Sequence, residues 1–295
     1  MQMYDNLLEN KKIIVYINLK SIKNFYYLRK MFSGKSIFIL FLSLSVILGS
    51  CSKYQKYLKS SDYALKYEKG VEYYEKKDYY RAVGLFEELE NIYKGSEKAE
   101  KIHYYMAYCY YNQGDNILAG YYFKNFSERY PLSVHREECD YMSAYCSYLN
   151  SPVPNLDQAY TYKAIDEMQL FLNKYPKSTR IAECNKIVDD LRYKLEVKSF
   201  RASKLYFDIE DYKAAIIALK NGLNDYPDTQ FREEILYLTL KSAYLLAENS
   251  INIKKAVRYQ DTVDEYYNLI AEFPNSIYLK EAKKIFDTST NKLKK

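Results

Sequence analysis

The residue whose type and surroundings point most directly to chemistry is Cys51. It follows an apolar run, Ile37–Leu48, and two small residues, Gly49 and Ser50. A basic flank, an apolar stretch and small residues before a cleavage point are typical of a secretory signal peptide. Because the next residue is a cysteine, the pattern is that of a lipobox. We therefore predict that the Cys51 thiol carries covalent lipid, palmitate included, and that cleavage makes it the new N-terminus.

The segment before Cys51 has the features of a targeting signal. Its apolar run is too short for a membrane-spanning helix, which needs roughly 20 residues. We therefore assign residues 1–50 to an N-terminal extension and a lipoprotein signal peptide. Residues 1–30 are long and mixed for such a signal, whereas Met31 opens a more typical one, so we expect translation to start there. The alternative is an ordinary signal peptide with a chance cysteine at its end.

The rest of the chain lacks motifs for catalysis or metal binding. It contains no dinucleotide-binding glycine motif, phosphate-binding loop, nucleophile elbow or zinc-protease helix. The two histidines, His103 and His135, are not spaced as ligands with cysteines or carboxylates. We predict that the protein is not an enzyme and uses no metal or cofactor apart from the lipid on Cys51.

Four more cysteines follow, in a compartment that permits disulfides. They are Cys109, Cys139, Cys146 and Cys184. Two of them, Cys139 and Cys146, are expected on one helix with Cα atoms about 10 Å apart, too far for a disulfide. We expect these cysteines to act as small buried apolar residues.

Most of the chain's excess of basic over acidic residues lies in the predicted targeting segment, residues 1–50. Residues 1–50 hold seven of the 44 basic residues and two of the 38 acidic ones, which leaves the remainder at a net charge of +1. A nucleic-acid partner would require clustered Lys and Arg on one face, so we expect none. The mature chain is poor in glycine and proline and shows no strand-like alternation, so we expect it to be helical.

A recurring five-residue motif, called here the phrase, divides this helical chain. It reads charged residue, aromatic residue, proline, any residue, then serine or threonine. It occurs at Arg129–Ser133, Lys174–Ser178, Asp225–Thr229 and Glu272–Ser276, and Ile92–Ser96 is a version without proline. Proline ends one helix and the hydroxyl residue can cap the next. The phrase therefore predicts a repeated joint between helices.

The residues upstream of each joint have the spacing of tetratricopeptide repeats, in which small residues let paired helices approach and bulky ones fill the gap. The five registers contain Gly70, Tyr73, Ala82 and Phe86; Ala107, Tyr110, Ala119, Phe123 and Pro131; Ala144, Ala164, Met168 and Pro176; Ser203, Tyr206, Ala215, Leu219 and Pro227; and Ala243, Tyr266 and Pro274. Extra residues fall at Asn150–Asn155, where we expect a loop, and around Asn249–Asn252.

We therefore predict an all-α fold, a right-handed superhelical solenoid of about five tetratricopeptide helix pairs with a capping helix over residues 277–293. Residues 51–61 would be a lipidated linker. Residues 62–176 would hold repeats one to three, and residues 177–295 would hold repeats four and five with the capping helix.

Tyrosine is unusually abundant, with 37 residues and no tryptophan. The repeat register places many of these rings on the inner face of the first helix of each pair. Tyrosine combines apolar area with a hydroxyl, which suits binding of extended peptides. The candidate peptide-binding groove comprises Tyr67, Tyr74, Tyr104, Tyr108, Tyr111, Tyr141, Tyr145 and Tyr148. The alternative is that these rings pack between helices.

A lipobox cysteine followed by five such repeats resembles the BamD family, the lipoprotein of the outer-membrane β-barrel assembly machine. The likeness is strongest at the third-repeat insertion and helix, Asp157–Ser178, and at Asp225–Gln230. The resemblance implies a lipid anchor at the periplasmic face of the outer membrane, a BamA-like barrel partner and unfolded β-barrel precursors as clients. Repeats one to three would take the client and the C-terminal repeats would dock the partner.

The residues after the lipid, Ser52–Lys56, contain no acidic residue. Their sequence therefore fits the periplasmic face of the outer membrane, rather than inner-membrane retention or surface export. The alternative function is that of another periplasmic tetratricopeptide lipoprotein, one that organises the cell envelope through peptidoglycan or Tol–Pal coupling.

Overall fold

The computed structural model describes residues 53–294, so Cys51, Met31 and the predicted signal peptide lie outside the described residues. Within this range the chain is helical and contains no strand. It forms two compact units, one ending at Cys109 and the other starting at Tyr110. The boundary falls inside α5 (Glu97–Asn112). Each unit is described by itself.

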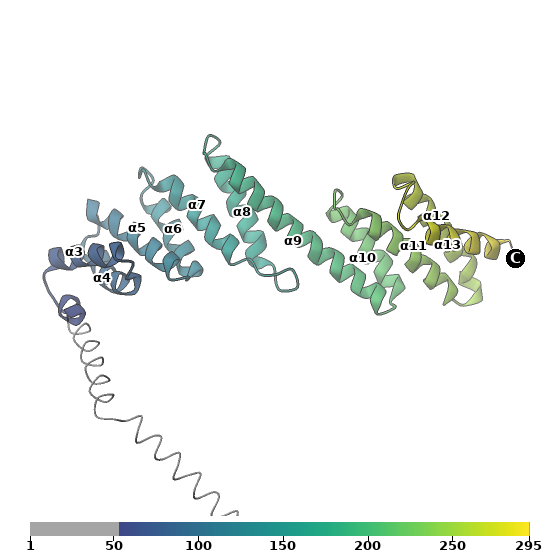
Figure 1. Ribbon diagram of the computed structural model, residues 1–295, viewed down its shortest axis with the longest axis horizontal. Helices are drawn as coiled ribbons and strands as arrows, with labels where there is room; N and C mark the ends of the chain where they lie inside the picture. The colour runs from purple at the N-terminus through teal and green to yellow at the C-terminus, as the bar shows by residue number, and fades with distance from the viewer. Residues whose placement is uncertain (1–52, 295) are drawn as a thin grey trace, which may run out of the picture. The chain divides into compact units, whose positions relative to one another are not determined.

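The first unit holds a short helix at 53–58, then α3 (Tyr63–Glu75), α4 (Tyr79–Ile92) and most of α5. Figure 1 shows α3 and α4 side by side as a helical hairpin. Asp78 caps α4, because its carboxylate accepts a hydrogen bond from the Arg81 backbone N–H. The core of this unit is apolar and fully buried, and includes Leu85, Phe86, Leu89, Ile102 and Met106.

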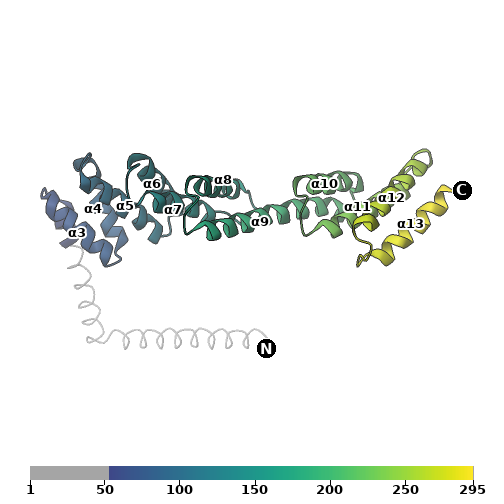
Figure 2. The same ribbon diagram turned by 90° about the horizontal axis from the view of Figure 1, so that it is seen from above.

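The second unit continues with eight further helices. They are α6 (Asn116–Arg129), α7 (Arg136–Leu149), α8 (Ala159–Lys174), α9 (Ile181–Asp208), α10 (Tyr212–Asp225), α11 (Arg232–Glu248), α12 (Asn252–Glu272) and α13 (Leu279–Leu293). Consecutive helices pack against each other. Figure 2 shows α8 and α10 against successive stretches of the long helix α9. Leu219, Leu240 and Leu269, from α10, α11 and α12, are fully buried in one apolar core.

The helix order is that of the predicted repeats. In chain order, α3 and α4, α5 and α6, α7 and α8, α9 and α10, and α11 and α12 occupy the two helix positions of successive repeats, and α13 follows as the capping helix. The prediction of an all-α tetratricopeptide-type solenoid is confirmed.

The small and large repeat positions contact each other as expected. Gly70 and Phe86 are both buried in the first unit. A Cβ atom on Gly70 would lie 2.7 Å from the Phe86 ring, which is too close for any side chain. Glycine is therefore required at this position, since α3 and α4 approach through it.

The joints differ in detail from the prediction. Each aromatic residue ends its helix as expected; Tyr130 and Tyr175, for example, are the C-cap residues of α6 and α8. The hydroxyl residue, however, does not cap the next helix directly. Ser133 Oγ accepts from the His135 backbone N–H at 3.1 Å, one residue before α7 starts. Ser178, Thr229 and Ser276 repeat this turn.

Three stretches between the predicted helices are more helical than the repeat register alone indicates. The predicted linker 51–61 contains the helix at 53–58. The extra residues of the fifth repeat extend α12 to 21 residues. The residues between repeats three and four lengthen α9 to 28 residues. The third-repeat insertion, residues 150–158, is a loop as predicted.

Candidate functional site

Four of the eight candidate groove tyrosines lie in the first unit and all four are half-buried. Tyr67 packs edge-on against Tyr93, with ring centroids 6.2 Å apart. Tyr74 packs at 4.6 Å against Tyr105 of α5. Tyr104 and Tyr108 lie one turn apart on α5, with centroids 4.9 Å apart. These rings therefore form aromatic contacts with their neighbours and expose part of their area.

The other four, Tyr111, Tyr141, Tyr145 and Tyr148, lie in the second unit. Three of them follow one another along α7: Tyr141 stacks on Tyr145 at 5.6 Å, and Tyr145 contacts Tyr148 at 5.6 Å. Tyr145 and Tyr148 are half-buried, as is Tyr111. The three α7 rings therefore contact one another in succession along the helix.

Tyr141 differs from the other seven because it is only 3% exposed. The Arg180 guanidinium lies over its ring at 4.1 Å, and Phe171 packs edge-on at 5.7 Å. Burial raises the pKa of Tyr141, and its hydrogen bond to Glu183 raises it further. Its ring is a packing element beneath the surface, which the sequence did not reveal because Arg180 and Glu183 come from the next repeat.

A cavity of about 200 Å³ lies among α6, α7 and α8. Its lining combines apolar and charged side chains and includes Lys124, Arg136, Asp140, Leu170, Phe171 and Lys174. Arg136 donates from Nη1 to the Pro131 carbonyl at 3.0 Å, while its buried Nε has no hydrogen-bond partner in the described chain. Such a cavity can accept an apolar side chain together with a hydrogen-bond acceptor, as an extended peptide offers.

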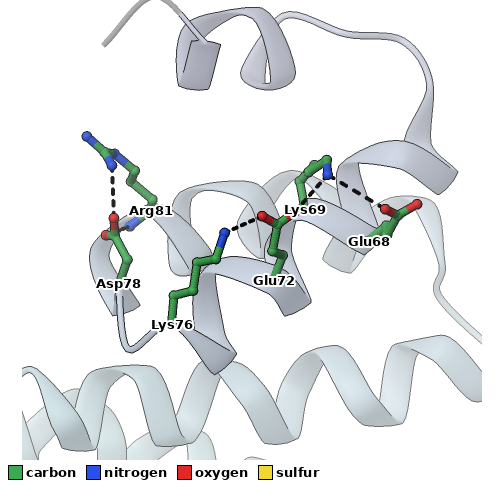
Figure 3. A network of polar contacts seen from close by, with 6 residues as sticks. All are labelled: Glu68, Lys69, Glu72, Lys76, Asp78 and Arg81. Atoms are coloured by element: carbon green, nitrogen blue, oxygen red, sulfur yellow. Dashed lines mark hydrogen bonds and ion pairs between the residues drawn. The ribbon is translucent and has the colours of Figure 1, made fainter. Parts of the chain in front are cut away.

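The surface of α3 and the start of α4 carries a network of ion pairs, shown in Figure 3. Glu72 accepts from Lys69 at 2.7 Å and also from Lys76, and these bonds lower the pKa of Glu72 to about 2. Arg81 pairs with Asp78 at 3.0 Å. These pairs are exposed, so they orient side chains more than they stabilise the fold.

The insertion loop 150–158 is held by basic residues of α9. Lys194 Nζ donates to the Ser151 Oγ at 2.6 Å, and Lys198 Nζ donates to the Leu156 carbonyl at 2.5 Å. The loop exposes Val153 and Leu156 to solvent. The sequence indicated the loop but not the residues that hold it.

The cysteines that the structure describes are free and buried, as predicted. Burial raises the pKa of the Cys109 and Cys146 thiols to about 12. A high pKa keeps both thiols protonated and unreactive at neutral pH.

Residues 53–294 provide neither a metal site nor a membrane-spanning helix. No group of three or more His, Cys, Asp or Glu residues in this range is placed to hold a metal ion. Of the helices in the same range, none is long and apolar enough to cross a membrane.

The paired helices and their rows of half-buried aromatic rings define the class of protein as a tetratricopeptide-type helical scaffold. Comparison with known proteins narrows this class. Residues 60–260 match the model of the YfiO family, which is described as an outer membrane lipoprotein. The chain belongs to this family.

Two relatives carry more specific names. One is a putative outer membrane protein assembly factor BamD from Aquifex aeolicus (strain VF5), 25% identical over 223 residues, which are 75% of this chain and 71% of the relative. The other is an outer membrane protein assembly factor BamD from Rickettsia prowazekii (strain Madrid E), 22% identical over 206 residues, with 70% and 82% covered.

Among solved structures, a TPR2AB-domain:pHSP90 complex of yeast Sti1 matches 78% of this chain and 99% of its own. The sequence identity is 13% and the TM-score is 0.35.

Proposed function

We propose that this protein is a scaffold for outer membrane protein assembly, held at the periplasmic face of the outer membrane by lipid on Cys51. The observation that carries the proposal is the match of residues 60–260, which contain almost all of the helix pairs, to a family of outer membrane lipoproteins. Two relatives named as outer membrane protein assembly factors support it. The protein acts by binding rather than by catalysis.

Within this proposal, residues 62–176 receive unfolded β-barrel precursors and residues 177–295 dock a BamA-like barrel protein. Stacked helix pairs present long surfaces, which suits a client that is extended and irregular. The half-buried tyrosines contribute ring edges and hydroxyls to that surface. The cavity among α6, α7 and α8 lies in the client-binding half and offers an apolar base formed by Leu170 and Phe171.

The partner assignment is tested by affinity purification of the tagged protein from detergent-solubilised envelopes. We expect a BamA-like barrel protein in stoichiometric amount. Recovery of peptidoglycan-synthesis or Tol–Pal proteins without a barrel protein would favour the cell-envelope organiser instead. A Cys51→Ala variant should be found in the soluble fraction with its helices intact; retention in the membrane without partners would refute the lipid anchor.

The client surface is tested with a matched pair of variants. Leu170 borders the cavity and is 65% exposed, and Ile217 on α10 is 54% exposed. Leu170→Glu should weaken binding of an unfolded barrel precursor by about tenfold, because a charge beside the cavity opposes insertion of an apolar side chain. Ile217→Glu, which is remote in sequence, should bind normally. Equal binding by both variants would exclude the cavity.

The tyrosine surface needs a change that leaves packing intact. Tyr104→Phe and Tyr108→Phe keep both rings and remove only the hydroxyls. If the hydroxyls bind clients, the double variant loses affinity while its unfolding temperature stays unchanged. Unchanged affinity would assign the two hydroxyls no part in binding.

A further inference from the structure

The segment directly after the predicted lipid site is a docked helix. In residues 53–58 the apolar and aromatic side chains, Tyr54, Tyr57 and Leu58, are half-buried on one side. Lys53 and Lys56 are exposed on the same helix, and Lys59 is exposed just after it. Because residues three and four apart share one side of a helix, this short helix has a half-buried apolar side and exposed lysines on the remaining surface.

Aromatic contacts hold the inner face of this helix on the first unit. The Tyr54 hydroxyl sits over Gly84, where an added Cβ atom would lie 2.4 Å from it. The Tyr54 ring packs edge-on against Tyr73 at 5.9 Å, and the Arg81 guanidinium lies 5.8 Å from the Tyr54 ring centre. The Lys69 ammonium lies 5.8 Å from the ring of Tyr57. Figure 3 shows Lys69 and Arg81 with the carboxylates that pair with them.

A buried lysine closes the contact at the end of the helix. Lys66 is 2% exposed, and its ammonium donates to the Leu58 carbonyl at 2.8 Å and pairs with Glu88. The carbonyls at a helix C-terminus lack partners within the helix, so Lys66 satisfies one of them. The helix orientation on the first unit is therefore fixed at both ends.

The outward face is basic and lies beside an exposed aromatic ring. No acidic residue occurs between Lys53 and Ser61. Tyr80, at the start of α4, is 78% exposed. Tyr80 directly precedes Arg81, whose guanidinium lies 5.8 Å from the Tyr54 ring centre, so Tyr80 lies near the docked helix.

We propose that this outward face, formed by Lys53, Lys56, Lys59 and Tyr80, rests on the anionic phospholipid headgroups of the membrane that anchors Cys51. The inference rests on the proposed lipid anchor. Lys53 is two residues from that anchor, so its backbone lies within about 7 Å of the lipidated residue. Lysines next to a membrane are attracted to anionic headgroups, and tyrosine prefers the interface. The docked helix then sets the orientation of the first repeat on the membrane.

The proposal is tested by lysine footprinting of the full lipidated protein in two kinds of vesicle, phosphatidylcholine alone and phosphatidylcholine with phosphatidylglycerol. The lipid on Cys51 holds the protein on both, so only the headgroup charge differs. Acetylation of Lys53, Lys56 and Lys59 should be slower by about fivefold on the anionic vesicles. Lys213 on α10, exposed in the same molecule, is the internal control and should not change.

The salt dependence of the acetylation rates, and mass spectrometry that detects lipid on Cys51, distinguish the possible results. The protection should vanish in about 1 M salt, where charge interactions are screened within about 3 Å. Lipid on Cys51 with equal acetylation rates on both vesicles would overturn the proposal and leave the proposed function intact. If the equal rates are also slow on both vesicles, protein rather than lipid covers the face, and the proposal is likewise overturned. Absence of lipid on Cys51 would overturn both the anchor and the membrane face.

A charge-matched pair of variants provides an independent test without the lipid. In the full mature chain with Cys51→Ser, the triple change Lys53→Glu, Lys56→Glu and Lys59→Glu should reduce flotation with anionic vesicles by at least about tenfold. The control carries Lys213→Glu, Lys254→Glu and Lys283→Glu, three exposed lysines with the same change in net charge. If both triple variants lost flotation equally, the attraction to the vesicles would come from net charge, and the proposed membrane-facing surface would be refuted.

Discussion

Within the described residues, lysine side chains help to hold two segments that lie outside the regular helix pairs. In the first unit, the buried Lys66 donates to the Leu58 carbonyl of the helix 53–58, which the ring contacts of Tyr54 and Tyr57 also hold. In the second unit, several groups share the task for the loop 150–158. Lys194 and Lys198 donate to it, and the buried Gln158 donates to two of its carbonyls at 2.9 Å.

The difference teaches where each segment is vulnerable. Where one buried donor provides the side-chain hydrogen bond to a segment, here called a clasp, loss of that donor leaves the carbonyl without a replacement donor. A clasp shared by several donors loses only a fraction of its bonds with any one change. The helix after the lipid site should therefore be released by single substitutions, whereas the insertion loop should resist them.

The largest expected effect is that of Lys66→Met, which keeps the volume and removes the donor. Loss of a charge-assisted hydrogen bond to a helix-end carbonyl costs about 2 kcal/mol. Amide exchange over residues 53–60 should accelerate by about thirtyfold, with α3 and α4 unchanged. Unaltered exchange over 53–60 would show that the aromatic contacts alone hold the helix.

Alkaline pH should release the same helix and spare the loop. Burial raises the pKa of Tyr54, so its contribution is complete below about pH 10, the unfolded value, and is lost as pH rises through the folded one. Burial lowers the pKa of Lys194, so deprotonation relieves a buried charge and does not weaken the fold. Raising the pH from about 8 to about 11 should therefore loosen 53–58 and leave the loop 150–158 in place.

Spin labels on Gln55→Cys and Val153→Cys, both exposed positions, report this difference in a Cys51→Ser background. The buried native thiols should not react with the label. Mobility that rises at both sites would indicate general unfolding, and mobility that rises only at Val153→Cys would reverse the assignment of the two clasps.

A smaller effect is expected from Gly84→Ala. The added methyl group would displace the Tyr54 hydroxyl, which costs about 1 kcal/mol, while alanine stabilises α4 by about the same amount. Exchange should therefore accelerate over 53–60 and slow within α4. Slower exchange in both segments would mean that the Tyr54 side chain moves aside at no cost.

The smallest effect is expected in the loop. Arg201 Nη1 donates to Asn155 Oδ1 at 3.2 Å on the exposed side of α9. Arg201→Ala should change the free energy of unfolding by less than about 0.5 kcal/mol, because the Lys194 and Gln158 bonds remain. Chemical denaturation measures it. A loss above about 1 kcal/mol would show that the loop depends on one residue, as the helix does.

The fold was largely predictable because its rules are local. The fit of Gly70 to Phe86 and the aromatic residue that ends each second helix follow from repeat spacing alone. The two clasps were not predictable. Nothing in the sequence distinguishes buried Lys66 from its partly exposed neighbour Lys69, because the acceptor that selects Lys66 is a main-chain carbonyl outside the repeats.

The candidate groove shows the same limit. The repeat register places the eight tyrosines on the first helix of each pair, but it cannot state how far each ring is covered. Tyr141 is buried because Arg180 and Glu183 of the following repeat cover it. Its neighbour Tyr145, one turn away, remains half-buried. Coverage depends on contacts between repeats, which spacing within one repeat does not encode.

The central claim, that this protein is a scaffold for outer membrane protein assembly, is tested most directly by depletion. The abundance of outer-membrane β-barrel proteins is measured as a class, relative to lipoproteins that contain no barrel. We predict that barrel proteins fall together on depletion, recover with the wild-type chain and do not recover with Cys51→Ala. Unchanged barrel levels in depleted cells would contradict the account.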